Sequence, residues 1–369
     1  MMITQIRNIA VFILTAFLFS CDLLKEPNDG TENGPVSEWE SLHFEDKRPT
    51  IMKLYRPYLY VGTRYHGLWR LKIETDDLHW EHLGPEFQGY GGGSNLQGID
   101  VYDGVITVGF VNPVRKNDDT GIGIWRSYDD GLTWEPADSG MYYNERRWSA
   151  SNDIARSHFN SDILLAGNYF RRYRSVDGGM SWIDKVEALT TYRFTWHPSE
   201  PDIVFKHGEG TWGSYLRLSM DKGITWQLVP TIGGHLSFLN YIAFDGSDHD
   251  IMYFTLGRHG LYKIDRGLEY LLNPDVPPET VIDITVHSVV TNPLQAGVFF
   301  AGCGIDYLCV SYDYGKTIYQ TPLPEGDELE IITMVYDELT NTLYVGRFGG
   351  GIYRLNYPFN AELTLYQQE

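Results

Sequence analysis

The stretch of sequence that decides the fold reads Ser127-Tyr-Asp129-Asp-Gly131-Leu-Thr-Trp134. In such a stretch the Asp carboxylate can accept backbone N–H bonds within a tight turn, and the Gly supplies a positive φ. The Trp then packs where the chain returns to a sheet. The pattern S-x-D-x-G-x-T-W recurs without gaps, with its Asp at Asp177, Asp221 and Asp313. Each copy predicts a stapled β-hairpin, and none is expected to be catalytic.

A second short element, expected to be the third strand of each repeat, precedes each box or the degenerate form of a box. It occurs more often than the box and shows that the repeat extends along the whole chain. Upstream of each lies another strand with alternating or apolar residues, so every repeat offers three or four short strands. The spacing of roughly 45 to 55 residues is the period of a propeller blade. The seven copies begin at Gly67, Gly123, Arg171, Ser214, Gly260, Tyr307 and Gly351. The sequence therefore predicts an all-β chain, a single β-propeller of seven four-stranded blades over residues 39–369.

Two segments compete to complete the last blade and close the ring. Val36 to Phe44 carries Trp39-Glu40, like the Trp134-Glu135 that follows a box. Leu363 to Tyr366, at the other end of the chain, is the alternative.

The N-terminus has the composition of an export signal. Arg7 is followed by an apolar run from Ile9 to Phe19, which is too short to span a bilayer comfortably. Leu18-Phe19-Ser20-Cys21 resembles the lipobox of bacterial lipoproteins, although Phe19 stands where a smaller residue is usual. We expect residues 1–20 to be a lipoprotein signal peptide, Cys21 to be lipidated, and the polar residues 21–38 to be a flexible tether. This predicts an outer-membrane lipoprotein of the bacterial cell envelope, periplasmic or surface-exposed.

The charge balance limits the partners. The chain has 49 acidic and 29 basic residues and a net charge of −20. Nucleic acid is therefore not expected as a partner of the surface as a whole. The sequence has no P-loop and no strand-to-helix dinucleotide fingerprint, so no cofactor is expected. We expect a monomer held to the membrane by its lipid anchor.

The remaining two cysteines, Cys303 and Cys309, lie six residues apart across an expected hairpin. In an exported protein this spacing favours a cross-strand disulfide, with two buried free thiols as the alternative. No metal site is expected, because two cysteines without neighbouring histidines supply too few ligands.

The repeated boxes resemble those of the Asp-box β-propeller superfamily, also called bacterial neuraminidase repeats. That superfamily includes sialidases, xyloglucan-acting glycosidases and sortilin-type receptors, and the resemblance covers essentially residues 39–369. It implies the fold far more than a function, because these proteins share the turn and not the chemistry. It also implies that ligands are met on the face opposite the boxes.

That opposite face collects the loops between second and third strands and those between blades. Arginine is frequent there despite the acidic composition, and aromatic residues accompany it. Arg binds carboxylate or sulfate bidentately, and Tyr or Trp can pack on a sugar ring. The alternative is a purely structural role, in which each Arg forms an ion pair with an acidic residue on a neighbouring blade. The candidate ligand-binding residues are Arg64, Tyr65, His66, Arg147, Trp148, Arg171, Arg193, His207, Trp212, Arg258, His259, Tyr307 and Arg347.

Two functions fit these residues. The first is a binding propeller that holds a glycan, acidic in the case the arginines favour, or a protein partner on this face. The second is a glycan-active enzyme, an exo-glycosidase or polysaccharide lyase, in which His or Tyr moves a proton while Arg neutralises a carboxylate. The sialidase resemblance would imply an early Arg-Ile-Pro segment, which Arg48-Pro49-Thr50 does not match. Because no complete catalytic set is present, the sequence favours the binding function.

Overall fold

The structure is a computed structural model, and it describes residues 39–75, 77–85, 95–111, 123–141, 153–167, 171–186, 190–210, 213–229, 239–265, 267, 271, 278–324, 330–358 and 363–367. The predicted signal peptide 1–20, the lipidated Cys21 and the tether 21–38 lie outside these residues. In the part of the chain that is described, no helix is long and apolar enough to cross a membrane.

Seven antiparallel sheets form the molecule, and the first four follow one another along the chain. Blade 1 contains β2 (Pro49–Tyr55), β3 (Tyr58–Thr63), β4 (Leu68–Lys72) and β5 (Trp80–Gly84). Blade 2 contains β6 (Asn95–Tyr102), β7 (Val105–Val111), β8 (Ile124–Ser127) and β9 (Glu135–Pro136). Blade 3 contains β10 (Asp153–Arg156), β11 (Leu164–Gly167), β12 (Arg171–Ser175) and β13 (Ile183–Val186). Blade 4 contains β14 (Thr190–Trp196), β15 (Val204–Gly210), β16 (Gly213–Ser219) and β17 (Gln227–Leu228).

The remaining three sheets complete the ring. Blade 5 contains β18 (Ile242–Phe244), β19 (Met252–Thr255), β20 (Leu261–Ile264) and β21 (Glu279–Ile282). Blade 6 contains β22 (Val286–Thr291), β23 (Phe299–Cys303), β24 (Tyr307–Ser311), β25 (Tyr319–Pro322) and, as a fifth strand, β29 (Thr364–Leu365). Blade 7 contains β26 (Ile331–Asp337), β27 (Thr342–Arg347), β28 (Ile352–Asn356) and β1 (Glu40–Ser41). The predicted seven-bladed, all-β propeller is confirmed.

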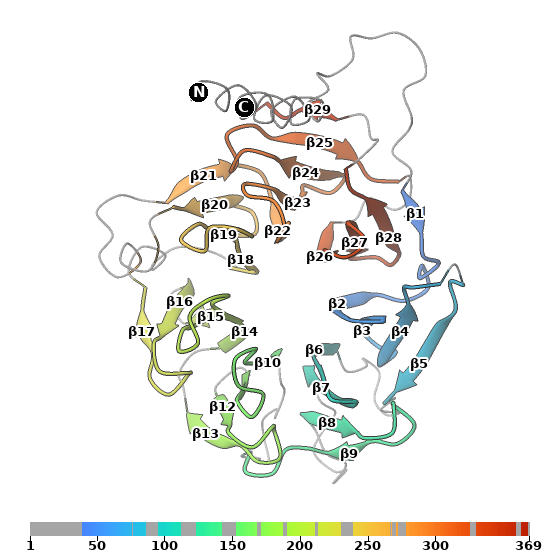
Figure 1. The fold of residues 1–369 in the computed structure, drawn as a ribbon, viewed down its shortest axis with the longest axis vertical. Coiled ribbons are helices and arrows are strands. Elements are labelled where there is room, and N and C mark those ends of the chain that lie inside the picture. The colour runs from blue at the N-terminus through green and yellow to red at the C-terminus, as the bar shows by residue number, and fades with distance from the viewer. Residues whose placement is uncertain are drawn as a thin grey trace, which may run out of the picture.

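The blades stand around a central axis with their first strands innermost (Figure 1). Consecutive strands within a blade are antiparallel neighbours, so successive turns alternate between two faces of the disc. We call one face the box face: it carries the turns between third and fourth strands, where the S-x-D-x-G boxes lie. We call the other the far face: it carries the hairpins between second and third strands and the connections between blades.

The N-terminal segment closes the ring. β1 pairs with β28, joining Glu40 to Arg354 and Ser41 to Tyr353. The C-terminal β29 pairs instead with β25 on the outer edge of blade 6. Of the two segments that the sequence offered for the closing strand, Val36 to Phe44 therefore contributes it. Blade 7 thus combines β1 from near the N-terminus with β26, β27 and β28 from near the C-terminus.

Packing between blades supplies the core. There are seven clusters of buried apolar residues, one at each junction between neighbouring blades. At the junction of blades 4 and 5, for example, Phe205 and Leu216 meet Phe254. Each such side chain, when fully buried, contributes about 1.5–3 kcal/mol relative to an exposed one.

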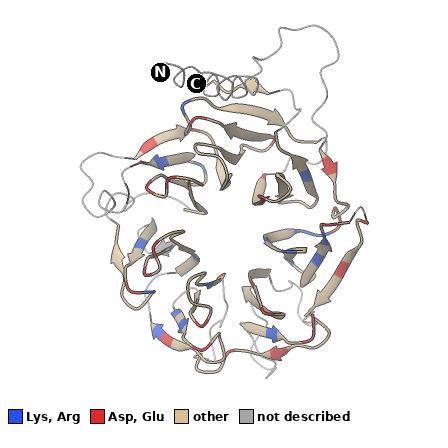
Figure 2. Cartoon of the chain, in the orientation of Figure 1, with Lys and Arg blue, Asp and Glu red and all other residues tan. Residues whose placement is uncertain are grey.

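Basic residues on the third strands of blades 1, 2, 3 and 5 fasten those blades to the next blade, at one fixed box position. Arg70 Nη2 donates to Asp130 at 2.8 Å, and Arg126 Nη2 donates to the Gly178 carbonyl at 3.1 Å. Arg174 Nε and Lys263 Nζ make the equivalent contacts to the carbonyls of Lys222 (2.9 Å) and Tyr314 (3.2 Å). Figure 2 shows basic residues recurring on these strands. The boxes therefore join blades as well as closing hairpins.

Blade 4 departs from this arrangement. In the sequence, Ser214 to Arg217 corresponds to Gly67 to Arg70 and to Gly123 to Arg126, which aligned Arg217 with these basic residues. In the structure the backbone of Arg217 is opposite Lys206 in the register of β15 and β16. Leu218, directly before the box serine Ser219, faces blade 5 and belongs to the apolar cluster between blades 4 and 5. Blade 5 contributes an eroded box, so an apolar residue fits there better than a cation without a partner.

The cysteines of blade 6 are joined. Cys303 and Cys309 form a disulfide across β23 and β24, with their Cα atoms 5.9 Å apart and both side chains buried.

Candidate functional site

A polar arc crosses four blades at the far-face ends of their innermost strands. Arg193, on β14, donates through Nη2 to the Tyr241 hydroxyl at 3.0 Å and lies 4.3 Å from the centre of that ring. Asn240, beside Tyr241, meets His287 Nδ1 of blade 6 at 3.2 Å. His287 Nε2 lies 2.8 Å from Glu330 Oε2 of blade 7. The arc forms because the first strands begin at this face and are neighbours around the axis (Figure 1).

The imidazole of His287 lies between an amide and a carboxylate. Asn240 places its amide nitrogen against Nδ1 and Glu330 places its carboxylate against Nε2, an arrangement that suits the tautomer with its proton on Nε2. The side chains of His287 and Glu330 are 26% and 36% exposed, so a ligand on the far face could reach both. A carboxylate paired with imidazole can hold a polar ligand or move a proton.

Beneath the arc lies a buried histidine without hydrogen bonds. His207 is directly opposite Arg193 on the neighbouring strand and has no exposed surface. Within the described residues neither of its ring nitrogens has a hydrogen-bond partner. Burial, and then the positive charge of Arg193, lower the pKa of His207 to about 3; the backbone of Leu239 opposes this shift less strongly, without full hydrogen-bond geometry. An unpartnered polar group of this kind calls for an explanation, and functional sites are where such groups concentrate.

Several far-face arginines contact no carboxylate in the described part of the chain. Arg64 lies 5.2 Å from the centre of the Tyr65 ring, and Arg193 donates to the Tyr241 hydroxyl and lies against that ring. Arg48 and Arg258 are exposed and form no ion pair with any described residue. Elsewhere arginines meet acids: Arg56, Arg70, Arg156 and Arg354 are all ion-paired. The far face thus keeps positive charge available in a protein of net charge −20.

The exposed candidates come from separate hairpins on this face. Arg64, Tyr65 and His66 occupy the β3–β4 hairpin of blade 1, while Arg258 and His259 occupy the β19–β20 turn of blade 5. Tyr307, 39% exposed, begins β24 in blade 6. These side chains share one face and come from three of the seven blades.

Three candidates are placed differently from the expectation. Arg171 is ion-paired with Asp184 on the adjacent strand of its own blade. Arg347 is 3% exposed and donates to the Pro324 carbonyl at 3.3 Å, and His207 is fully buried. Because strand residues alternate between the two sides of a blade, these side chains turn into blade interfaces rather than toward a ligand. The candidates Arg147, Trp148 and Trp212 lie outside the described residues.

Tyr241, Asn240 and Glu330 were missed in the sequence. They lie in connections between blades, where no repeat motif marks them. Aligning the starts of the first strands, at Arg193, Asn240 and His287, was the signal that could have revealed them, because these starts meet at one place in a propeller.

The fold has clear relatives among solved structures. The GH74 xyloglucanase from Xanthomonas campestris matches with a TM-score of 0.62 at 16% identity, covering 87% of this chain and 54% of that chain. YCF48 bound to D1 peptide matches with a TM-score of 0.61 at 11% identity, over 90% and 99% of the two chains. YCF48 from Cyanidioschyzon merolae matches with a TM-score of 0.61 at 11% identity, over 87% and 98%. What they share with this chain is the propeller fold. No protein-family model and no curated protein sequence matches.

The similarity to these structures supports the assignment of the fold. This propeller spans about half the length of the xyloglucanase that it matches. At such identities the likeness shows the fold alone, and the far-face side chains must carry any argument about function.

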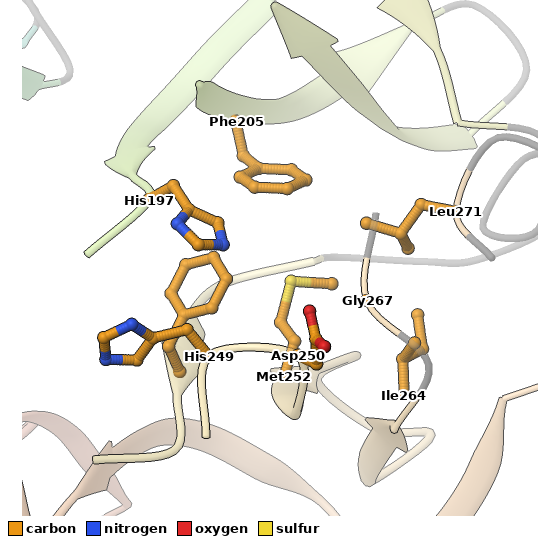
Figure 3. Close-up of a pocket in the computed structure, with 9 residues that line it drawn as sticks. His197, Phe205, His249, Asp250, Met252, Ile264, Gly267 and Leu271 are labelled. Carbon is orange, nitrogen blue, oxygen red and sulfur yellow. The ribbon is translucent and has the colours of Figure 1, made fainter. Parts of the chain in front are cut away.

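A small pocket on the box face of the propeller lies between blades 4 and 5 (Figure 3). It is found where blade 5 has an eroded box, and Leu271 stands near the place that a box Trp would fill. Its base is apolar, with Phe205 and Met252, and its rim carries His197, His249 and Asp250. Burial, and then the neighbouring His249, lower the pKa of His197. Among the described residues no three His, Cys, Asp or Glu side chains converge as a metal site would require.

Proposed function

We propose that this protein is a lipoprotein of the bacterial cell envelope that binds an acidic glycan on its far face. The observation that supports this most is the set Arg48, Arg64, Arg193 and Arg258, which meets no carboxylate in the described part of the chain. Guanidinium groups bind carboxylates and sulfates through paired N–H donors. An acidic protein that leaves these groups unneutralised on one face is suited to an anionic ligand.

Exposed aromatic rings support a sugar as the carrier of that charge. Tyr65, Tyr307 and Phe348 are 42%, 39% and 47% exposed on the same face, and such rings can pack on the apolar faces of sugars. One structural neighbour is a xyloglucanase and another is described with a bound peptide. An acidic peptide is therefore the competing ligand.

The test of this proposal is retention. The mature chain would be passed over immobilised acidic polysaccharides, matched neutral ones and acidic peptides. We expect retention on the acidic polysaccharides alone. Retention on neutral polysaccharide to the same extent, or on acidic peptides only, would contradict the proposal.

Removal of single far-face arginines should weaken binding. Because a charge-assisted hydrogen bond contributes about 1.5–3 kcal/mol, we expect Arg64→Ala and Arg258→Ala each to lower affinity roughly tenfold or more. Titration calorimetry with an acidic oligosaccharide measures this. The control is Lys316→Ala, which removes one exposed positive charge from the box face and should leave affinity unchanged. Equal losses in all three variants would point to net charge alone.

A second function, a glycan-active enzyme, is favoured by one observation. His287 and Glu330 form a 2.8 Å imidazole–carboxylate pair on the far face, and such a pair could move a proton. Following reducing ends and the ultraviolet absorbance of unsaturated sugars during the retention assay separates turnover from binding. Product that disappears in Glu330→Gln would establish the enzyme; retention without product would exclude it for the polysaccharides tested.

A further inference from the structure

The box face carries apolar side chains that are exposed at two fixed positions of the box. These are the second and sixth positions of S-x-D-x-G-x-T-W in blades 2, 3 and 4. Leu132 is the most exposed, at 84%, and the others are between 51% and 59% exposed. We call this set the apolar row: Tyr128, Leu132, Val176, Met180, Met220 and Ile224.

The geometry of the turn explains why apolar groups project. The box carboxylate is used inside its own turn: Asp129 accepts from the Thr133 N–H at 2.8 Å, and Asp177 accepts from the Ser181 N–H at 2.9 Å. Hydrogen bonds from Thr133 hold the pKa of Asp129 below its usual value. Side chains at the second and sixth positions therefore point away from the turn, while the charged group stays within it.

The row is continuous between blades. The Tyr128 hydroxyl lies 3.4 Å from Met180 Sδ, so the second position of blade 2 meets the sixth position of blade 3. Apolar side chains scattered singly need no explanation, but a contiguous exposed set marks an interaction surface.

The chain enters the propeller from this same face. β1 runs antiparallel to β28, whose last residue, Asn356, lies at the box-face end. Trp39, the first described residue, therefore lies at the box-face end of blade 7. The 18 residues from 21 to 38 could reach about 60 Å when extended, at about 3.3 Å per residue, which is enough for the disc to lie against the membrane that would hold Cys21.

We propose that the apolar row rests on the lipid bilayer, so that the box face lies toward the membrane and the far face points away from it. This inference rests on the proposed function in one respect, the lipid on Cys21. A bilayer surface of zwitterionic headgroups suits this protein best, because a net charge of −20 opposes an anionic surface. Partial insertion of aliphatic and aromatic side chains supplies the second of the two signals that stable anchoring requires.

The orientation has a consequence for ligand binding. The far-face arginines would be presented to the space outside the membrane, where a polysaccharide can approach without crossing the lipid surface.

The row can be tested without the lipid. Cys21→Ser protein would be mixed with vesicles of phosphatidylcholine and phosphatidylethanolamine and separated by flotation. Since burial of each large apolar side chain is favourable, we expect the triple variant Leu132→Asn, Met180→Asn, Ile224→Asn to bind roughly tenfold less. The matched control, Tyr65→Asn with Phe348→Asn, removes exposed aromatic groups from the far face and should float like the parent.

Three outcomes would overturn the proposal: no flotation of the parent, equal loss in both variants, or a parent dimer that only the row variant dissociates in sedimentation. The last would assign the row to a second copy of this chain. A lipid on Cys21, read by mass spectrometry, and acidic-glycan binding are measured separately. Failure of the row therefore leaves the proposed function standing, and a missing lipid or lost glycan binding is recognised as a failure of the proposed function.

A fluorophore tests orientation in the complete lipidated protein. On vesicles containing a nitroxide-labelled lipid, a dye at Leu132→Cys should be quenched and a dye at Tyr65→Cys should not. The reverse pattern, or equal quenching, would overturn the orientation.

Discussion

Replacing Asp100 by alanine is expected to lower the free energy of unfolding by about 3–5 kcal/mol. Asp100 on β6 of blade 2 holds Arg156 on β10 of blade 3, with Nη2 to Oδ2 at 2.6 Å and Nε to the two oxygens at 3.2 and 3.0 Å. The side chains are 3% and 12% exposed. Loss of the carboxylate strands a mostly buried guanidinium between blades, and this uncompensated charge is what destabilises the protein.

Urea unfolding at neutral pH measures this effect. The control is Glu338→Ala, an exposed acid on the β26–β27 turn with no ion pair among the described residues, and it should change stability by less than about 0.5 kcal/mol. A similarly small change in Asp100→Ala would show that the pair does not hold the blades together. Arg56 and Asp337 form a similar pair between blades 1 and 7, but Arg56 is 25% exposed and also meets Glu74 at 3.1 Å, so Asp337→Ala should cost less than Asp100→Ala.

Acidification should destabilise the protein through His207. Its folded-state pKa is lowered from 6.5 to about 3, so between these values the unfolded chain binds a proton that the folded chain does not. Above pH 6.5 the ring is neutral in both the folded and the unfolded chain. The free energy of unfolding decreases as the pH falls below that value. At about 1.4 kcal/mol per pH unit, the loss between pH 7 and roughly 4.5 is about 2.5 kcal/mol.

His207→Leu isolates that effect. The variant removes the titrating ring from an apolar setting, so it should be as stable as the parent or more stable at pH 7 and lose less stability on acidification. His66→Gln, which changes an exposed histidine on the same face, should retain the parent's pH dependence. If His207→Leu and the parent lose stability in parallel, the buried ring is not the cause. Lower glycan affinity in a more stable variant would show that His207 serves binding rather than folding.

The fold was readable from the sequence because its signals are local. A box such as Ser127 to Trp134 defines its own turn, and seven third strands set the number of blades. The ring closure by Glu40 and Ser41 was left between two alternatives, because a two-residue edge strand has no periodicity of its own. The register error at Arg217 was avoidable, because Arg126 and Arg174 stand directly before their box serines, and Leu218 holds that place before Ser219.

The sequence predicted which face of the propeller carries the candidate site, but not how the residues there are paired. Far-face loops followed from topology, and Arg64, Arg193 and Arg258 were found in this way. Whether an arginine is neutralised depends on its neighbours in space. Arg171 meets Asp184 on the adjacent strand, whereas the other three arginines meet no carboxylate among the described residues. Likewise, the burial of His207 depends on a one-residue alternation along β15, and Glu330 meets His287 only because blades 6 and 7 are neighbours.

The most direct test of the anionic far face is a calorimetric titration of an acidic oligosaccharide at two salt concentrations. It compares the parent with the triple variant Arg64→Gln, Arg193→Gln, Arg258→Gln. We expect binding to the parent to weaken as salt rises, and the variant to bind roughly 100-fold or more weakly with little further salt dependence. Unchanged affinity in the folded triple variant would contradict the claim that these arginines hold the ligand.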